Sequence, residues 1–332
     1  MNSETEIYKI AITVLMPVYN ASNYLNEAIE SILNQSFIDF EFLIINDGST
    51  DQSEEIIMSY KDARIRYIKK EENQRLIATL NEGFKLAKGK YIVRMDADDI
   101  SLPKRLEKQF RFMEGNSQIL LSGSWCESFG DNTGISKYQT NHDAIKFKMM
   151  YQCHIVHPTI IIRKSIFDTI NPKFDPNFIH AEDYELFVRI GENHLLANIP
   201  EVLLKYRVHS KSISNTYTEI QLKNSAEIRT RIFKNLGFSI SKELLDDYIK
   251  LNYQDYKNIN SSGIQIKSML EQIKLKNDES GYFNYDYLEA QIALLWFHYC
   301  YNTKQRNLYY NSFLSKSKAI RKLDKIKLFF KS

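Results

Sequence analysis

The sequence predicts an α/β protein built on a mostly parallel central sheet with helices on both faces, followed by a helical C-terminal region. Strand-like and helix-like segments alternate from Ile10 onward, which is typical of a parallel sheet covered on both sides. Three polar turns, PVYN, NDGSTD and DADD, each follow a strand-like run. Beyond Asn215 the pattern is helical, rich in Lys, Tyr and Ile, and without Pro. Ligands bind such sheets beyond the carboxyl ends of the strands, so the three turns mark one functional edge.

The first hundred residues are expected to form four strands with helices between them. The strands are continuous β-branched apolar runs, as in strands buried on both faces: IAITVLMPVYN, FEFLIIND, the shorter RIRYIKK and KYIVRMD. The first helix has apolar residues at helical spacing, and Ser49 or Thr50 is expected to cap the second. These helices are predicted over Tyr24–Gln35, from the cap to about Tyr60, and over Leu76–Ala87.

Residues 101–215 change in character. A helix over Pro103–Met113 precedes the strand ILLSGSW, and a polar loop follows at 129–136. HPTIIIRKSIF is expected to be a strand leading into a helix, and AEDYELFVRIGE a helix that opens with two carboxylates. LLKYRVHSKSIS is a strand that leads to a polar, basic loop. We therefore expect one domain over 1–215, in halves 1–100 and 101–215, and a helical region over 216–332.

The composition is that of an ordinary globular protein, with 332 residues, 43% hydrophobic, 26% charged and a net charge of +3. This charge does not by itself imply a nucleic-acid partner. Three widely spaced cysteines argue against a disulfide framework and for a reducing compartment. The polar N-terminus lacks a signal-peptide pattern, and the apolar runs fall short of the ~18 residues of a spanning helix. A cytoplasmic location is expected.

The acidic turn places three carboxylates, Asp96, Asp98 and Asp99, within four positions after a buried strand. Like charges this close repel each other unless a cation lies between them. An EF-hand fits poorly, because the sixth position from Asp96 is Ser101 and not Gly. A solvated acidic loop is one alternative. The other is a hard divalent ion, Mg²⁺ or Mn²⁺, whose coordination is completed by substrate phosphates.

The other two turns offer complementary groups. Tyr19 presents an aromatic face on which a nucleobase can stack, and Asp47 can accept a hydrogen bond from a uracil ring nitrogen. The alternative is that Tyr19 is an aromatic at the core edge and Asp47 a turn residue. The absence of a GxGxxG or Walker loop argues against dinucleotide and NTPase chemistry.

Four segments together resemble glycosyltransferase family 2, the inverting enzymes with the GT-A fold. They are VLMPVYNASNYLNEAIESILNQSF, FEFLIINDGSTD, LNEGFKLAKGKYIVRMDADD and AEDYELFVRI, and the resemblance covers about residues 10–215. More narrowly, MDADDISLPKRLEKQ, GSWCESFG, HPTIIIRKSI, AEDYELF and LLKYRVHSKSIS look like bacterial β-1,3-N-acetylglucosaminyltransferases of lipooligosaccharide, and like related capsule and O-antigen enzymes.

The resemblance implies a role for each matching residue. Pro17, Tyr19, Asp47 and Arg75 would hold the uridine end of a nucleotide-sugar, although the family often has Gly where Arg75 stands. Asp96 would contact the ribose, Asp98 would bind the metal that bridges the diphosphate, and Asp99 could share either role. Asp183 matches the general base, beside Glu182, which would orient the acceptor or the metal shell. His209 falls where relatives place a further metal or diphosphate ligand, and Arg207 and Lys211 would help to neutralise the leaving diphosphate.

Two of these roles have alternatives. A carboxylate at a helix start, such as Asp183, commonly stabilises the helix N-terminus. A histidine in a strand-to-loop stretch, such as His209, can be a plain surface residue.

The resemblance thus implies a nucleotide-binding half over 1–100 and an acceptor half over 101–215. The expected activity is metal-assisted transfer from a UDP-sugar to a hydroxyl of a growing bacterial surface glycan. N-acetylglucosamine is the favoured sugar, and galactose, glucose and N-acetylgalactosamine are alternatives. A nucleotidyltransferase should show a Gly-rich, Lys-bearing first loop, which MPVYNASN is not. A non-catalytic nucleotide- or glycan-binding module stays open.

The C-terminal segment 315–332, SKSKAIRKLDKIKLFFKS, has apolar residues on one side of a helical wheel and basic residues opposite. This pattern fits a helix lying on an anionic membrane, at the inner face of the cytoplasmic membrane. It fits equally a helix packed on the domain with a solvated basic back. The apolar stripe is Ile320, Leu323, Ile326 and Phe330, and the basic residues are Lys318, Arg321, Lys322 and Lys325. The preceding helices suit either an oligomer interface or a lid over the acceptor.

Overall fold

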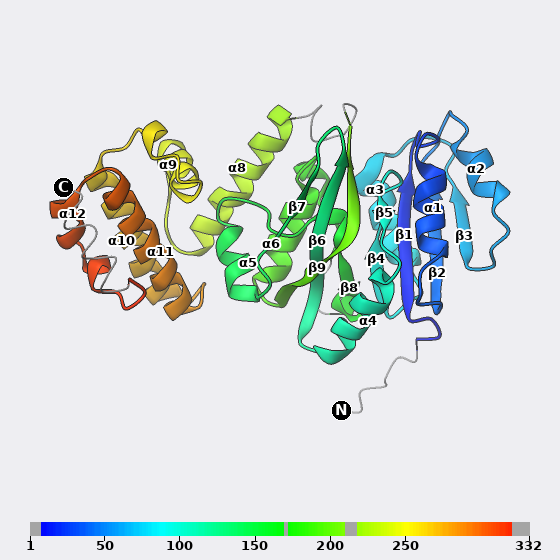
Figure 1. Cartoon of the computed structure of the whole chain (residues 1–332), viewed down its shortest axis with the longest axis horizontal. Coiled ribbons are helices and arrows are strands. Elements are labelled where there is room, and N and C mark those ends of the chain that lie inside the picture. Colours follow the sequence, from blue (N-terminus) through cyan, green and yellow to red (C-terminus); the bar gives the residue numbers. More distant parts are fainter. Residues whose placement is uncertain (1–7, 169–171, 210–217, 321–332) are drawn as a thin grey trace. The chain divides into compact units, whose positions relative to one another are not determined.

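The computed structural model describes residues 8–168, 172–209 and 218–320 (Figure 1). The chain divides into two compact units. Unit 1 comprises Met1–Ile145 and His154–Ser225, and unit 2 comprises Lys146–Cys153 and Ala226–Ser332. The functional boundary at residue 215 stays a prediction.

Unit 1 is built on a mixed nine-stranded sheet with the order β3-β2-β1-β4-β8-β6-β9-β5, and β7 pairs with β6. The first four strands are parallel, β8 is antiparallel to its neighbours β4 and β6, and β9 is again parallel to β6. This confirms the predicted α/β class. The strands are β1 (Ile12–Val18), β2 (Phe40–Asn46), β3 (Ile65–Lys69), β4 (Tyr91–Arg94), β5 (Ile100–Ser101), β6 (Ile119–Gly130), β7 (Gly134–Ser136), β8 (Ile161–Arg163) and β9 (Leu195–Val208).

Alternation along β1 explains why helices cover both faces. Val14 and Met16 point to a buried cluster shared with α1 and α2, whereas Leu15 points to the opposite face, against α3. A Cβ atom on Gly83 of α3 would lie 2.3 Å from Leu15, so glycine lets α3 pack directly on the sheet. The helices of unit 1 are α1 (Leu25–Leu33), α2 (Ser53–Ser59), α3 (Arg75–Leu86), α4 (Arg105–Gly115), α5 (His142–Lys148, which runs into unit 2) and α6 (Glu182–Gly191).

Unit 2 is helical among its described residues, as predicted. Its core contains Trp296 and the edge-on pair of Phe233 and Tyr248, whose ring centroids lie 5.2 Å apart. A capping box between Ser262 and Gln265 begins α10. The helices are α8 (Thr218–Asn235, which begins in unit 1), α9 (Lys242–Asn252), α10 (Gly263–Ser280), α11 (Tyr285–Asn302) and α12 (Arg306–Tyr310).

Some expected boundaries are wrong. Helix α2 begins at Ser53, so neither Ser49 nor Thr50 caps it, and both instead form hydrogen bonds with Asn20. HPTIIIRKSIF contains only a three-residue strand between two 3₁₀ turns. The expected polar loop at 129–136 is largely a hairpin, because β6 extends to Gly130 and pairs with β7.

The C-terminal segment differs from its expected helix where it is described. Residues 315 and 316 end the short 3₁₀ helix Phe313–Lys316, and residues 318–320 form a turn and a bend. Ile320 is 5% exposed, so it is buried and not part of an exposed apolar stripe. The remainder of the expected membrane helix, 321–332, lies outside the described residues, as does Lys211. Among the described helices, none combines the length and the apolar character needed to cross a bilayer.

Candidate active site

The ends of β1 and β2 place Tyr19 and Asp47 next to each other. Both residues follow a paired position, Val18 opposite Asn46, and the Asp47 N–H donates to the Val18 carbonyl at 2.8 Å. Tyr19 is 48% exposed, so its ring is open to a ligand, whereas Asp47 is 3% exposed. Pro17 lies on β1 opposite Ile45, two residues before Tyr19.

The loop after β1 is fixed by side chains of NDGSTD and of Ser53, the first residue of α2. The N–H groups of Asn20, Ala21 and Ser22 donate to Ser49 Oγ, Ser53 Oγ and Asp51 Oδ2 at 2.9 to 3.0 Å. Burial alone would raise the pKa of Asp51, but the hydrogen bonds from Ser53 and Ser22 lower it to about 2. The loop that carries Tyr19 is therefore held by a carboxylate that stays ionised.

Arg75 is brought to the same edge by the loop before α3. The preceding N–H, that of Gln74, donates to Asp47 Oδ1 at 3.1 Å. Gly48 makes this approach possible: it has φ +71°, and a Cβ there would lie 2.6 Å from the carbonyl carbon of Glu72. Arg75 itself is exposed and has φ +70°. Pro17, Tyr19, Asp47 and Arg75 thus share one end of the parallel strands.

The acidic turn after β4 gathers its three carboxylates. Asp96, Asp98 and Asp99 each offer an oxygen within 4.8 Å of the others. His209 Nε2 lies 3.1 Å from Asp98 Oδ2. Asp99 Oδ1 accepts the Arg207 N–H at 2.8 Å, and Asp99 Oδ2 is buried without a partner among the described residues. Oxygen ligands with one imidazole suit a hard divalent ion such as Mg²⁺ or Mn²⁺.

The protonation of this turn reflects its crowding. Burial, together with the charges of Asp98 and Asp183, raises the pKa of Asp96 to about 6, against the opposing charge of Arg94. Burial and the charges of Asp96 and Asp98 raise the pKa of Asp99 well above its usual value. The carboxylates repel each other enough to favour protonation or a bound cation.

Glu182 and Asp183 open α6 beside this turn. Asp183 acts electrostatically on Asp96, and its Oδ1 accepts the N–H of Tyr184 at 2.7 Å. Burial raises the pKa of Asp183, and burial together with the charge of Asp183 raises the pKa of Glu182 to about 7. A helix-stabilising carboxylate alone does not need this buried, paired setting.

Arg207 is held by contacts within the protein. Its Nε donates to the Asp98 carbonyl at 2.7 Å, and its guanidinium forms an ion pair with Glu27. The guanidinium carbon lies 4.4 Å and 4.3 Å from the ring centroids of Tyr24 and Phe129. In this structure Arg207 therefore fixes the backbone of the acidic turn.

A model of the family described as glycosyl transferase family 2 matches residues 13–170. An uncharacterized glycosyltransferase of Methanocaldococcus jannaschii is 40% identical over 216 residues, which cover 62% of this chain and 73% of that protein. The chain belongs to glycosyltransferase family 2.

Two further proteins, one similar in sequence and one in fold, are informative for this family 2 glycosyltransferase. The Escherichia coli UDP-Glc:alpha-D-GlcNAc-diphosphoundecaprenol beta-1,3-glucosyltransferase WfgD is 28% identical over 259 residues, covering 74% of this chain and 97% of WfgD. The crystal structure of S. aureus TarS 1-349 in complex with UDP-GlcNAc has a TM-score of 0.58 at 15% identity, covering 96% of this chain and 90% of that chain. The likeness to TarS supports the GT-A fold.

The family 2 match contains some of the predicted site residues and not others. Pro17, Tyr19, Asp47, Arg75, Asp96 and Asp98 lie within residues 13–170, and Glu182, Asp183, Arg207 and His209 lie beyond them. The individual roles of all ten remain proposals.

The sequence interpretation gave no role to Arg94, which is central to the site. Arg94 is 3% exposed, pairs with Asp96, and its charge lowers the pKa of Asp96, Asp99, Glu182 and Asp183. Its Nε is buried without a partner among the described residues. The signal was a charged residue within the otherwise apolar run KYIVRMD, since a buried cation needs acidic partners.

Proposed function

We propose that this glycosyltransferase moves a sugar from a UDP-sugar to a hydroxyl of a growing bacterial surface glycan, with inversion at the anomeric carbon. The observation that carries the proposal is the juxtaposition of three crowded carboxylates with a partly buried carboxylate on α6, that of Asp183. Asp96, Asp98 and Asp99 offer oxygens within 4.8 Å of one another, and Asp183 raises the pKa of Asp96. The three carboxylates of the acidic turn suit the binding of a metal ion and a diphosphate, and Asp183 suits contact with the reacting hydroxyl.

In this proposal the donor lies along the strand ends. The uracil stacks on Tyr19 and donates its ring N–H to Asp47, with Pro17 and Arg75 flanking it, and Asp96 accepts from the ribose. Asp98 and His209 hold a Mn²⁺ or Mg²⁺ ion, which when bound stabilises negative charge on the departing diphosphate. Arg207 supports the diphosphate through the Asp98–Asp99 backbone that it fixes.

Asp183 is proposed as the general base. An inverting transfer needs one group that takes the proton of the acceptor hydroxyl as its oxygen attacks from the face opposite the leaving group. Because no covalent intermediate is needed, one carboxylate suffices. Burial raises the pKa of Asp183, which strengthens it as a base, and Glu182 orients the acceptor.

N-acetylglucosamine is the favoured donor sugar, supported by the narrower sequence resemblance. Glucose is the nearest alternative, supported by the similarity to WfgD, whose name specifies UDP-Glc. That name also specifies a diphosphoundecaprenol acceptor, which supports a lipid-linked acceptor for this chain. Peripheral contact with the inner face of the membrane through 315–332, and self-association through the C-terminal helices, extend the same proposal.

The deciding experiment replaces Asp183, the proposed general base. We expect Asp183→Asn to lower transfer about 10²- to 10⁴-fold while UDP affinity is unchanged, because the amide cannot take a proton. UDP release from UDP-N-acetylglucosamine and UDP-glucose with Mn²⁺, and calorimetry with UDP, measure the two quantities. Asp286→Asn is the matched control, since Asp286 is also a first-turn acid, on α11. Near wild-type turnover in Asp183→Asn would show that Asp183 only stabilises its helix.

A further inference from the structure

We propose that Lys70 sets the base selectivity of the nucleotide site by occupying one of the two oxygens of Asp47. The inference rests on the proposed function, because it takes Asp47 as the acceptor for the base. Lys70 Nζ lies 3.2 Å from Asp47 Oδ1, and the Gln74 N–H donates to the same oxygen. Asp47 Oδ2 has no hydrogen-bond partner among the described residues. One acceptor oxygen is thus used within the protein and one is left for a ligand.

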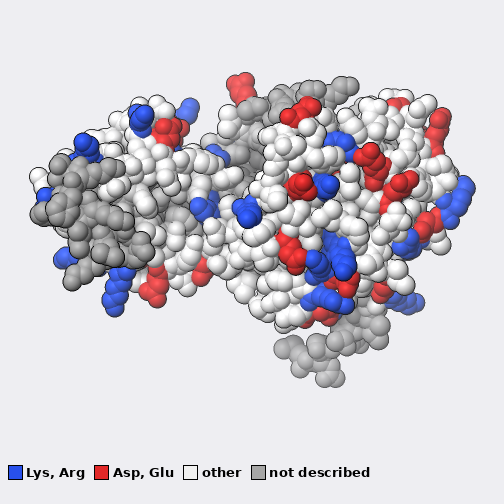
Figure 2. Space-filling model, in the orientation of Figure 1, with Lys and Arg blue, Asp and Glu red and all other residues white. Residues whose placement is uncertain are grey.

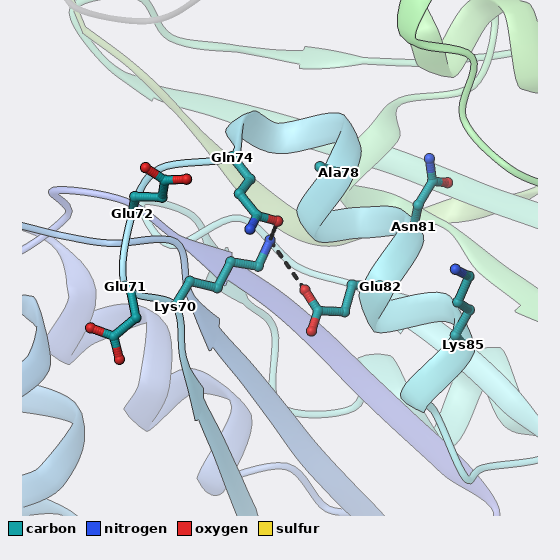
Figure 3. Close-up of a pocket in the computed structure, with 8 residues that line it drawn as sticks. All are labelled: Lys70, Glu71, Glu72, Gln74, Ala78, Asn81, Glu82 and Lys85. Atoms are coloured by element: carbon teal, nitrogen blue, oxygen red, sulfur yellow. Dashed lines mark hydrogen bonds and ion pairs between the residues drawn. The ribbon is translucent and has the colours of Figure 1, made fainter.

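Lys70 is fixed in this position. It is 7% exposed, and its ammonium contacts Thr79 Oγ1 at 2.7 Å and Glu82 Oε2 at 3.2 Å besides Asp47. Figure 3 shows the side chain reaching from the end of β3 toward α3, with Gln74 and Glu82 on either side of its ammonium. A buried ammonium is stable only when acceptors surround it, so Lys70 is expected to keep its contact with Asp47.

An open cavity of about 700 Å³ adjoins this contact. Half of its lining comes from one face of α3, and the other half from the segment before α3, which includes Lys70. The lining residues are Lys70, Glu71, Glu72, Gln74, Ala78, Asn81, Glu82 and Lys85. Neither Asp47 nor Tyr19 lines this cavity, so in this proposal the base is selected by hydrogen bonding at Asp47 and not by the volume of the cavity.

The hydrogen-bonding patterns of the bases decide between them. Uracil has a single ring N–H, between two carbonyl groups, and one carboxylate oxygen satisfies it. Guanine has a ring N–H beside an exocyclic amino group, and this pair matches both oxygens of a carboxylate. With Oδ1 taken by Lys70 and Gln74, the guanine amino group would lose an acceptor. Cytosine has no ring N–H at this position and presents the lone pair of its ring nitrogen instead, which repels the carboxylate.

Three nucleoside diphosphates test this assignment by calorimetry in the presence of Mn²⁺: UDP, GDP and IDP. Hypoxanthine, the base of IDP, keeps the ring N–H of guanine and lacks its amino group. We expect the wild-type protein to bind UDP about tenfold or more above GDP, and IDP at least as well as GDP. Lys70→Met removes one of the two donors to Oδ1 and leaves the Gln74 N–H in place, so Oδ1 can accept one further hydrogen bond and GDP should gain about tenfold relative to IDP.

Glu82→Gln is the matched control, because it removes another partner of Lys70 and leaves the Asp47 contact; its GDP to IDP ratio should equal that of the wild type. Thermal unfolding reports whether Lys70→Met folds. If it does not, the wild-type protein decides, since tighter binding of GDP than of IDP would overturn the inference. An unchanged ratio in folded Lys70→Met overturns the inference and leaves UDP-sugar use intact. Absence of UDP binding to the wild type overturns both.

Discussion

At the scale of single residues, the fold holds several acidic side chains close together in the site despite their mutual repulsion. Glu182 and Asp183 are adjacent on α6, and Asp183 acts on Asp96 of the acidic turn. Arg94 is a buried cation that opposes this repulsion, and the buried Arg105 also interacts with Asp96 and Asp99. The raised pKa values indicate that these two cations do not fully compensate the carboxylates. The site without ligands therefore lowers the stability of the protein at neutral pH, and a bound divalent ion would relieve the strain.

Glu182→Gln should reveal this cost as a change in the pH dependence of stability. The pKa of Glu182 is raised from its ordinary 4.5 to about 7 in the folded protein, so the folded state binds more protons than the unfolded state between these values. The stability that Glu182 contributes is complete below about pH 4.5 and is lost as the pH rises through about 7. At pH 8 the variant should gain on the order of 2 kcal/mol over the wild type, and at pH 4.5 nothing.

Urea unfolding of the nucleotide-free and metal-free protein measures this difference across the pH range. The uncoupled acids titrate alike in both proteins, so the difference between the two curves reports Glu182 together with its interaction with Asp183. Parallel curves from pH 4.5 to 8 would contradict the prediction.

Sequence reasoning predicted the chemical types at the site better than their contacts. The three turns indicated that Tyr19, Asp47 and Asp96 share one edge, because parallel strands end together. The positions of Arg94 and Arg207 could not be predicted, since they depend on which acids the fold buries near each guanidinium. Arg207 pairs with Glu27, which is 180 residues away in the chain. A local sequence pattern does not indicate which distant residue will form such an ion pair.

At the scale of elements, three loops hold one another at the strand ends. The loop after β1 donates its N–H groups to NDGSTD, and NDGSTD accepts the loop before α3 through Asp47. Apart from Ser53, which begins α2 and accepts the Ala21 N–H, the residues that make these contacts lie in loops. The donor end of the site depends on the close approach of Gly48 to the peptide between Glu72 and Asn73.

Gly48→Ala should therefore weaken nucleotide binding without touching a proposed ligand residue. Its Cβ would lie 2.6 Å from Glu72 C and 2.7 Å from Asn73 N, and its φ of +71° disfavours alanine. We expect a loss of about 1 kcal/mol or more in unfolding free energy and about tenfold in UDP affinity, as Gln74 moves away from Asp47. Gly115→Ala is the control, because no atom lies within 4 Å of its added Cβ. Equal UDP affinity in both variants would contradict this role of Gly48.

Long apolar elements were predictable and short paired ones were not. The first four strands have continuous apolar runs, which periodicity detects. The two-residue strand β5 and the three-residue strand β7 are defined by their partners, β9 and β6, and not by their own composition. The same applies to α2, whose start at Ser53 follows from contacts made by Ser49 and Thr50 with Asn20.

At the scale of the whole molecule, an octapeptide from the middle of the chain belongs with the C-terminal helices. Lys146–Cys153 is part of unit 2. Phe147 contacts the ring of Tyr287 at 6.2 Å between centroids, Tyr151 contacts Tyr253 at 5.7 Å, and Tyr248 Oη lies 3.4 Å from Met150 Sδ.

Figure 2 shows acidic and basic side chains intermingled on one face, with no large area of a single sign there.

A fragment that ends at Ser225 should aggregate. It keeps Phe147, Met150 and Tyr151, which are at most 4% exposed in the full chain, but lacks the helices that cover them. Light scattering after size-exclusion chromatography would show this, and replacing Phe147 and Tyr151 by Ser in the fragment should restore monomers. A monomeric, cooperatively unfolding fragment without these replacements would contradict the prediction.

This arrangement limits how the gene can be rearranged. Since the polypeptide passes from one unit to the other after Ile145, Cys153 and Ser225, the helical portion is not a terminal cassette that recombination can exchange at one junction. A chimera that imports a foreign C-terminal portion must import a matching octapeptide at 146–153 as well. Among homologues, the two segments should therefore be inherited together and vary together, even where the rest of the chain diverges.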